Sequence, residues 1–155
     1  MAVVRILVDG YSLLHSWPEL APGKARYSAA AREELVHQLM LYRDSVGTPI
    51  TVVFDGAGPA PDASQVPSTP ECEIIFSRSG QSADNIIERV AAMMKPYGEI
   101  IAVTNDRAER DTVVAMGGFI MGCDQFIRDI QLALGEMQND IKRLNRREGS
   151  GFNDR

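Results

Sequence analysis

Aspartates follow several short apolar segments of this sequence, at positions where a strand would end or a helix would begin. They are Asp9, Asp55, Asp84, Asp106 and Asp124. Carboxylates that are far apart in sequence but share one edge of a sheet repel one another, unless a cation lies between them. Oxygen ligands without cysteine or histidine favour Mg²⁺ or Mn²⁺. The pattern therefore predicts a metal site formed by Asp9, Asp84 and Asp106.

A structural explanation of the same aspartates stays open. Aspartate is common after strands because it forms turns and caps helices. Asp84 and Asp124 each fit the start of a helix, and for Asp124 we prefer the cap. For Asp9 alone, a turn is as good an explanation as a ligand. The coincidence of Asp9, Asp84 and Asp106 favours the metal site, because perturbed acidic clusters concentrate at functional sites.

Basic and aromatic side chains flank these aspartates in the sequence. The basic ones are Lys24, Arg26, Arg78, Arg107 and Arg110. Side chains on loops around a site are well placed to bind phosphate, although each is equally well explained as a surface charge. Tyr11 and Trp17 can stack on nucleobases, and packing explains them equally well.

Apolar runs alternate with helical patterns along the chain. Strands are expected at residues 3–8, 50–54, 73–76, 100–104 and 119–121, and helices at 28–46, 82–95, 107–116 and from a cap at Asp124 to about 144. Residues 56–70 contain four prolines and two glycines, so a loop is expected there. Strands separated by helices predict an α/β fold with a mainly parallel sheet, whose carboxyl ends share one edge.

Length and composition set further bounds. The 155 residues suit one domain, expected at 1–146, with 147–155 as a flexible tail. No apolar run approaches the roughly 18 residues of a membrane span. The N-terminal apolar stretch is interrupted by Arg5 and does not have the form of a signal peptide. We therefore expect a cytoplasmic protein without a membrane partner.

Other chemistries find little support in the sequence. Cys72 and Cys123 are far apart, and only two histidines are present, which argues against a zinc site. Both cysteines are expected to be reduced and structural. A phosphate-binding GxxxxGK[ST] motif is absent from the chain. The formal net charge of −5 argues weakly against broad nonspecific binding of nucleic acid.

Four segments resemble, in this order, the YacP-like NYN family of PIN-like endoribonucleases. They are VRILVDGYSLLHSW (4–17), ITVVFDGA (50–57), EIIFSRSGQSADNIIE (73–88) and IIAVTNDRAER (100–110). The resemblance implies a PIN-like α/β/α sandwich with strand order 3-2-1-4-5. It also implies Mg²⁺- or Mn²⁺-dependent endonucleolytic cleavage of RNA, in RNA processing or in cleavage of messages on ribosomes.

The resemblance also implies roles for particular residues. Asp9, Asp84 and Asp106 would bind the metal and carry catalysis, Asp55 would orient a ligand or a water, and Ser12 would hydrogen-bond to Asp9, to a metal-bound water or to the phosphate. Several positions depart from the family, among them Asn105 in its TSD-like run, which keeps the ability to hydrogen-bond. Ser12 stands in place of asparagine, and Asn85 stands in place of a second acid, which leaves fewer ligands for a second metal.

The sequence thus predicts a ribonuclease that contacts RNA through Arg78, Arg107, Arg110, Lys24, Arg26 and Tyr11. Two alternatives stay open. The chain can be a PIN-like module that binds RNA or the ribosome without cutting, or an enzyme that acts on a small phosphorylated substrate. The oligomeric state is not predicted.

Overall fold

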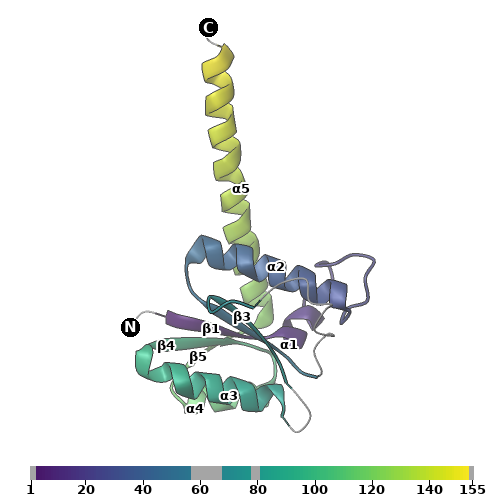
Figure 1. The fold of residues 1–155 in the computed structure, drawn as a ribbon, viewed down its shortest axis with the longest axis vertical. Coiled ribbons are helices and arrows are strands. Elements are labelled where there is room, and N and C mark those ends of the chain that lie inside the picture. The colour runs from purple at the N-terminus through teal and green to yellow at the C-terminus, as the bar shows by residue number, and fades with distance from the viewer. Residues whose placement is uncertain (1–2, 57–67, 78–80, 154–155) are drawn as a thin grey trace.

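A five-stranded sheet forms the centre of the protein (Figure 1). The computed structural model describes residues 3–56, 68–77 and 81–153, without the side chains of 137–140 and 148–153. The strands are β1 (Val3–Asp9), β2 (Ile50–Phe54), β3 (Cys72–Phe76), β4 (Glu99–Val103) and β5 (Phe119–Met121). All neighbouring strands are parallel, in the order β3-β2-β1-β4-β5. The predicted fold class and strand order are confirmed.

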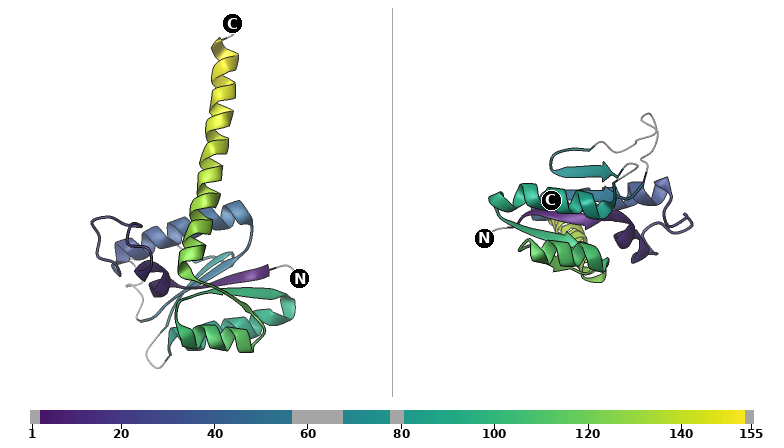
Figure 2. Two further views of the ribbon diagram at one scale, coloured as in Figure 1. Left: turned by 180° about the vertical axis from the view of Figure 1, so that it is seen from behind. Right: turned by 90° about the horizontal axis from the view of Figure 1, so that it is seen from below.

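Helices cover both faces of the sheet. They are α1 (Gly10–His15), α2 (Ala29–Val46), α3 (Ala83–Met94), the 3₁₀ turn η1 (Lys95–Tyr97), α4 (Arg107–Ala115) and α5 (Cys123–Asn153). Helices α2 and α5 lie on one side of the sheet, and α3 and α4 lie on the other (Figures 1 and 2). Alternate residues of β1 serve the two layers, since Ile6 and Val8 pack on the α2 side and Leu7 packs on the α3 side. A strand that is buried on both faces has this continuous apolar sequence.

Local capping explains where the helices begin and end. The hydroxyl of Ser28 accepts a hydrogen bond from the backbone N–H of Ala31, and α2 ends at Gly47 with a φ of 81°. Ser82 caps α3 in the same way through the N–H of Asn85. Both boundaries agree with the sequence, because serine favours the N-cap and glycine accepts the left-handed conformation at the end of a helix.

Three features differ from the expectations. Helix α1 was not expected, and it forms because Asp9 caps it through the N–H of Ser12. Helix α5 begins at Cys123, so Asp124 is not its cap, and the side-chain oxygen of Asn105 accepts from the N–H of Cys123 at 3.1 Å instead. The helical conformation of α5 also continues to Asn153, so no helix end marks the expected boundary at residues 146 and 147.

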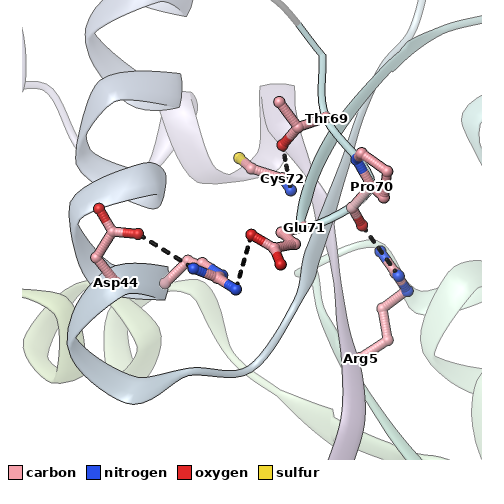
Figure 3. A network of polar contacts seen from close by, with 7 residues as sticks. Arg5, Asp44, Thr69, Pro70, Glu71 and Cys72 are labelled. Carbon is pink, nitrogen blue, oxygen red and sulfur yellow. Dashed lines mark hydrogen bonds and ion pairs between the residues drawn. The ribbon is translucent and has the colours of Figure 1, made fainter.

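Charged side chains at the amino ends of the strands are paired. Arg43 lies 2.8 Å from Glu71 and 3.3 Å from Asp44 (Figure 3). Arg5 donates to the carbonyl of Pro70 at 3.2 Å and to the hydroxyl of Thr51 at 3.0 Å. These contacts tie α2, β1 and β2 to the segment that leads into β3.

Two further expectations concern the whole chain. Cys72 and Cys123 are both free and buried, as predicted. In the part of the chain that the structure describes, no helix is both long enough and apolar enough to span a membrane.

Candidate metal centre

Asp9 ends the central strand and is almost enclosed. Its side chain is 8% exposed. One carboxylate oxygen accepts from the backbone N–H of Ser12 at 3.2 Å, and the other accepts from the hydroxyl of Thr104 at 3.4 Å. Thr104 directly follows β4, so Asp9 is held between the carboxyl ends of two adjacent strands.

Two acids come from the first turn of α4. Asp106 is its N-cap and accepts from the backbone N–H of Glu109 at 3.1 Å. Glu109 lies on the same helix face as Val113, four residues later, and that face is turned to the core. Glu109 is therefore only 2% exposed, while Asp106 is open to solvent.

A third acid comes from the first turn of α3. Asp84 follows the cap Ser82 and is half-buried. One oxygen from each of Asp84, Asp106 and Glu109 lies within 4.8 Å of the other two. The N-terminal turns of α3 and α4 thus bring three carboxylates to one point, and the positive ends of both helix dipoles favour negative charge there.

Glu109 lacks a donor that its buried carboxylate needs. Its Oε2 lies 3.4 Å from the hydroxyl of Thr104, but no described residue donates to its buried Oε1. Thr104 has a single hydroxyl proton, which it must share between Asp9 and Glu109. A buried carboxylate oxygen without a donor is costly, so a proton or a cation is required at this position.

The electrostatics agree with that requirement. Burial raises the pKa of Glu109 to about 10, and its hydrogen bond to Asp9 and the charges of Asp9, Asp84 and Asp106 add to the rise. Burial also raises the pKa of Asp84, helped by Asp106, Asp9 and Asp55 and opposed by a hydrogen bond with Glu109. The cluster resists full ionisation as long as only carboxylates face one another.

A divalent cation fits this arrangement. The donors are all carboxylate oxygens, as hard cations such as Mg²⁺ and Mn²⁺ prefer. The unpartnered Oε1 of Glu109 offers a ligand atom that the protein leaves unused. The acidic cluster therefore has the composition and spacing of a metal site.

The predicted acidic residues gather at this edge, but in different positions. Asp84 and Asp106 belong to the three-oxygen group. Asp9 is not in that group and sits beside Glu109, whose pKa it raises. Asp55 is exposed, accepts from the hydroxyl of Ser77 at 2.7 Å and contributes to the raised pKa of Asp84.

Ser12 links α1 to the start of α4. Its backbone N–H donates to Asp9, and its hydroxyl accepts from the backbone N–H of Asn105 at 3.3 Å. Ser12 therefore positions the loop that carries Asp106. Its predicted contact with a water or a phosphate stays a prediction.

The predicted RNA-binding residues lie around the centre to differing degrees. Arg107 and Arg110 are exposed on α4, and Lys24 and Arg26 are exposed between α1 and α2. Arg78 lies outside the described residues. The ring of Tyr11 is half-buried and packs edge-on against two other rings, so much of its surface is used for packing.

The sequence interpretation missed Glu109. A signal was available, because Asp106 and Glu109 have the spacing of a capping box. In such a box the glutamate turns back to the N-cap N–H, but here Thr104 accepts from the N–H of Asp106 at 3.0 Å and leaves Glu109 free to point inward. The helical phase that Glu109 shares with Val113 would have shown it to be buried.

Comparisons with known proteins give a consistent result. Residues 6–155 match the family described as the YacP-like NYN domain. The protein YacP of Bacillus subtilis is 24% identical over 147 residues, which cover 94% of this chain and 86% of YacP. The crystal structure of Rae1 (YacP) from B. subtilis superposes with a TM-score of 0.80 at 25% identity, over 97% of this chain and 86% of that one. A tryptophan-to-leucine variant of Rae1 gives a TM-score of 0.76 at 24% identity, over 91% and 83% of the two chains.

Proposed function

The chain belongs to the YacP-like NYN domain family, within the PIN-like nuclease superfamily, and on this premise we propose that it is a Mg²⁺- or Mn²⁺-dependent ribonuclease. The observation that carries the proposal is Glu109, a buried carboxylate with an unpartnered oxygen, beside Asp84 and Asp106. A structural acid in the core is normally paired with a cationic side chain or fully hydrogen-bonded. Glu109 faces other acids instead, and this arrangement is expected at a site that binds a metal ion.

Each residue of the centre has a distinct task in this proposal. Asp84, Asp106 and Glu109 hold the metal. When bound, the metal supplies a water of lowered pKa and offsets the negative charge of the phosphate and the leaving oxygen. Asp9 and Thr104 fix the orientation of Glu109 through their hydrogen bonds to its carboxyl group. Asp55, exposed near Asp84, is placed to accept a hydrogen bond from the attacking water.

The substrate is proposed to be RNA. Arg107 and Arg110 lie on the first turns of α4, directly after Asp106, where they can bind phosphates next to the scissile one. Lys24, Arg26 and Tyr11 extend this contact surface, and Arg78 stays an RNA-binding residue proposed from the sequence alone. We further propose endonucleolytic cutting, in RNA processing or in cleavage of messages on ribosomes.

A cleavage assay with a mixture of structured and single-stranded RNAs tests the function. The purified protein should cut RNA internally with Mg²⁺ or Mn²⁺ and not with chelator. Asp84→Asn should remove the activity, while Asp44→Asn, at the opposite end of the sheet, should retain it. Metal-independent cleavage, or equal activity of the two variants, would contradict the proposal.

A second candidate is a module that binds RNA or the ribosome without cutting. Asn85 favours it, because this exposed amide stands next to Asp84 where the family has a second acid. The same assay decides between the candidates when RNA binding is measured beside it. Tight binding without cleavage in either metal would support the non-cutting module.

A further inference from the structure

A small cavity opens between α1, the connection that follows it and α2. It has a volume of about 220 Å³, and its walls include Leu14, Trp17, Leu20 and Ala21. Leu14 and Trp17 are 2% and 7% exposed, so they form the floor. Lys24 and Arg26 also line the cavity and are exposed, so they form its rim.

The rim carries the positive charges of Lys24 and Arg26. Among the described residues, no carboxylate forms an ion pair with Lys24 or Arg26. The guanidinium of Arg26 lies 3.3 Å from Nδ1 of His15, which also lies 3.0 Å from the hydroxyl of Tyr27. These contacts orient the guanidinium of Arg26 through His15. Two unpaired cations above an apolar floor favour a ligand with one anionic and one apolar part.

The cavity adjoins the candidate metal centre. Asn105, the residue before Asp106, donates through its side chain to the hydroxyl of Ser16 at 3.1 Å. The next residue after Ser16 is Trp17, the floor of the cavity. One hydrogen bond and one peptide bond thus join the cavity floor to the residue before Asp106.

We propose that this cavity is a subsite for one nucleotide unit of the RNA substrate. The base or ribose packs on the walls at Leu14, Trp17, Leu20 and Ala21, and the phosphate binds Lys24 and Arg26. The volume lies below the roughly 300–1,000 Å³ of pockets for drug-sized ligands, so the cavity is too small for two units. The assignment of the ligand to RNA rests on the proposed function, while the cavity and its charge do not.

The protein contains a direct reporter of occupancy. Trp17 is the single tryptophan of the chain, so tryptophan fluorescence reads this cavity alone. Adenosine monophosphate is titrated in the presence of chelator, with excitation at wavelengths that adenine does not absorb. We expect a saturable change in fluorescence. The double variant Lys24→Ala with Arg26→Ala should weaken binding by about tenfold or more, since about 1.4 kcal/mol is tenfold in affinity.

A second variant separates the cavity from its charge. Ala21→Phe fills the space and keeps both cations, so it should abolish the response. Arg89→Ala removes an exposed cation on α3 and should leave the response unchanged. Circular dichroism melts verify that each variant is folded. The absence of a saturable response in the natural protein, or an unchanged response in a folded Ala21→Phe variant, would overturn the subsite.

The outcome is independent of the cleavage assay. If RNA is cut but the nucleotide does not bind at Trp17, the subsite is wrong and the ribonuclease proposal stands. If the nucleotide binds and no RNA is cut in any metal, the subsite stands as a nucleotide site and the ribonuclease proposal is wrong.

Discussion

Charged side chains at the two ends of the sheet differ in whether they form ion pairs. At the amino ends of the strands, Arg43 pairs with Glu71 and Asp44, and Arg5 is hydrogen-bonded to Pro70 (Figure 3). Arg5 is also hydrogen-bonded to Thr51. Lys95 likewise pairs with Glu99 at the start of β4. At the carboxyl ends, Asp9, Asp84, Asp106 and Glu109 face one another, and among the described residues none of them has an ion pair.

The difference separates a structural use of charge from a functional one. Paired charges at the amino ends join elements of the fold. The carboxyl-end acids raise the pKa of Glu109 and of Asp84, and one oxygen of Glu109 has no donor among the described residues. A folded protein can keep acids close together where a bound ligand offsets their repulsion. Acids with perturbed pKa values therefore mark functional sites.

The largest effect is expected on cleavage. Asp106→Asn should lower RNA cleavage by at least about a hundredfold, because loss of charge stabilisation by a metal costs several kcal/mol and about 2.7 kcal/mol is a hundredfold in rate. Asparagine is as good an N-cap as aspartate, so α4 should stay folded. Initial rates in Mg²⁺ provide the measurement. Near-natural activity of Asp106→Asn would contradict a functional role for the acids at the carboxyl ends of the strands.

The next effect concerns stability without metal. The pKa of Glu109 is raised from 4.5 to about 10 in the folded protein. Below the unfolded value both states hold the proton. Above it only the folded state does, so stability should fall as pH rises through this window. Glu109→Gln keeps the shape and removes the dependence. The size of the effect follows from the repulsion between an ionised Glu109 and one neighbouring carboxylate. At about 5 Å and an effective dielectric of about 20, two charges repel by roughly 3 kcal/mol, before screening.

Melting temperatures in chelator at about pH 5 and about pH 8 check this prediction. The natural protein should lose stability at the higher pH, and Glu109→Gln should not. Asp9→Asn should shift the melting temperature in the same direction, because it removes the charge that contributes most to the raised pKa of Glu109. If both variants melt at lower temperatures than the natural protein at alkaline pH, the carboxyl-end acids are structural after all.

At the amino ends the opposite result is expected. Thr51→Val removes the hydroxyl that accepts from Arg5 and donates to Glu73 at 3.1 Å. Because partly buried groups then lose a partner, unfolding should become easier by about 1–3 kcal/mol. Cleavage should be unchanged once the protein is folded. Denaturant unfolding beside the cleavage assay tests both statements. A loss of activity in a folded variant would contradict a purely structural role for the contacts at the amino ends.

The smallest effect is expected on salt dependence. RNA affinity should fall as salt rises, and Arg107→Ala should lower the magnitude of the slope by about one unit, the loss of one phosphate contact. Arg128→Ala removes an exposed arginine in the second turn of α5, is the matched control and should leave the slope unchanged. Filter binding over a range of salt concentrations gives both slopes. Equal slopes for the two variants would exclude Arg107 from the binding surface.

Local patterns in the sequence determined much of the fold. Continuous apolar runs such as residues 50–54 identified the buried strands, and Ser28 with Gly47 set the limits of α2. The position of Asp84 and Asp106 after strands was enough to place them at the carboxyl edge, because parallel strands all end there. These features depend on neighbours in sequence, which a single chain displays directly.

Other features depend on contacts between distant segments, and only the tertiary structure decided them. Asn105 rather than Asp124 caps α5, because the loop before α4 lies against the start of α5. Glu109 joins the acidic centre because Thr104 occupies the N–H that a capping glutamate would otherwise bind. Asp9 and Thr104 are separated by most of the chain, and only the pairing of β1 with β4 brings them together. The sequence by itself determined that Asp9, Asp84 and Asp106 reach the edge of the sheet, and the packing of α3 and α4 determined that Glu109 joins Asp84 and Asp106 at one point.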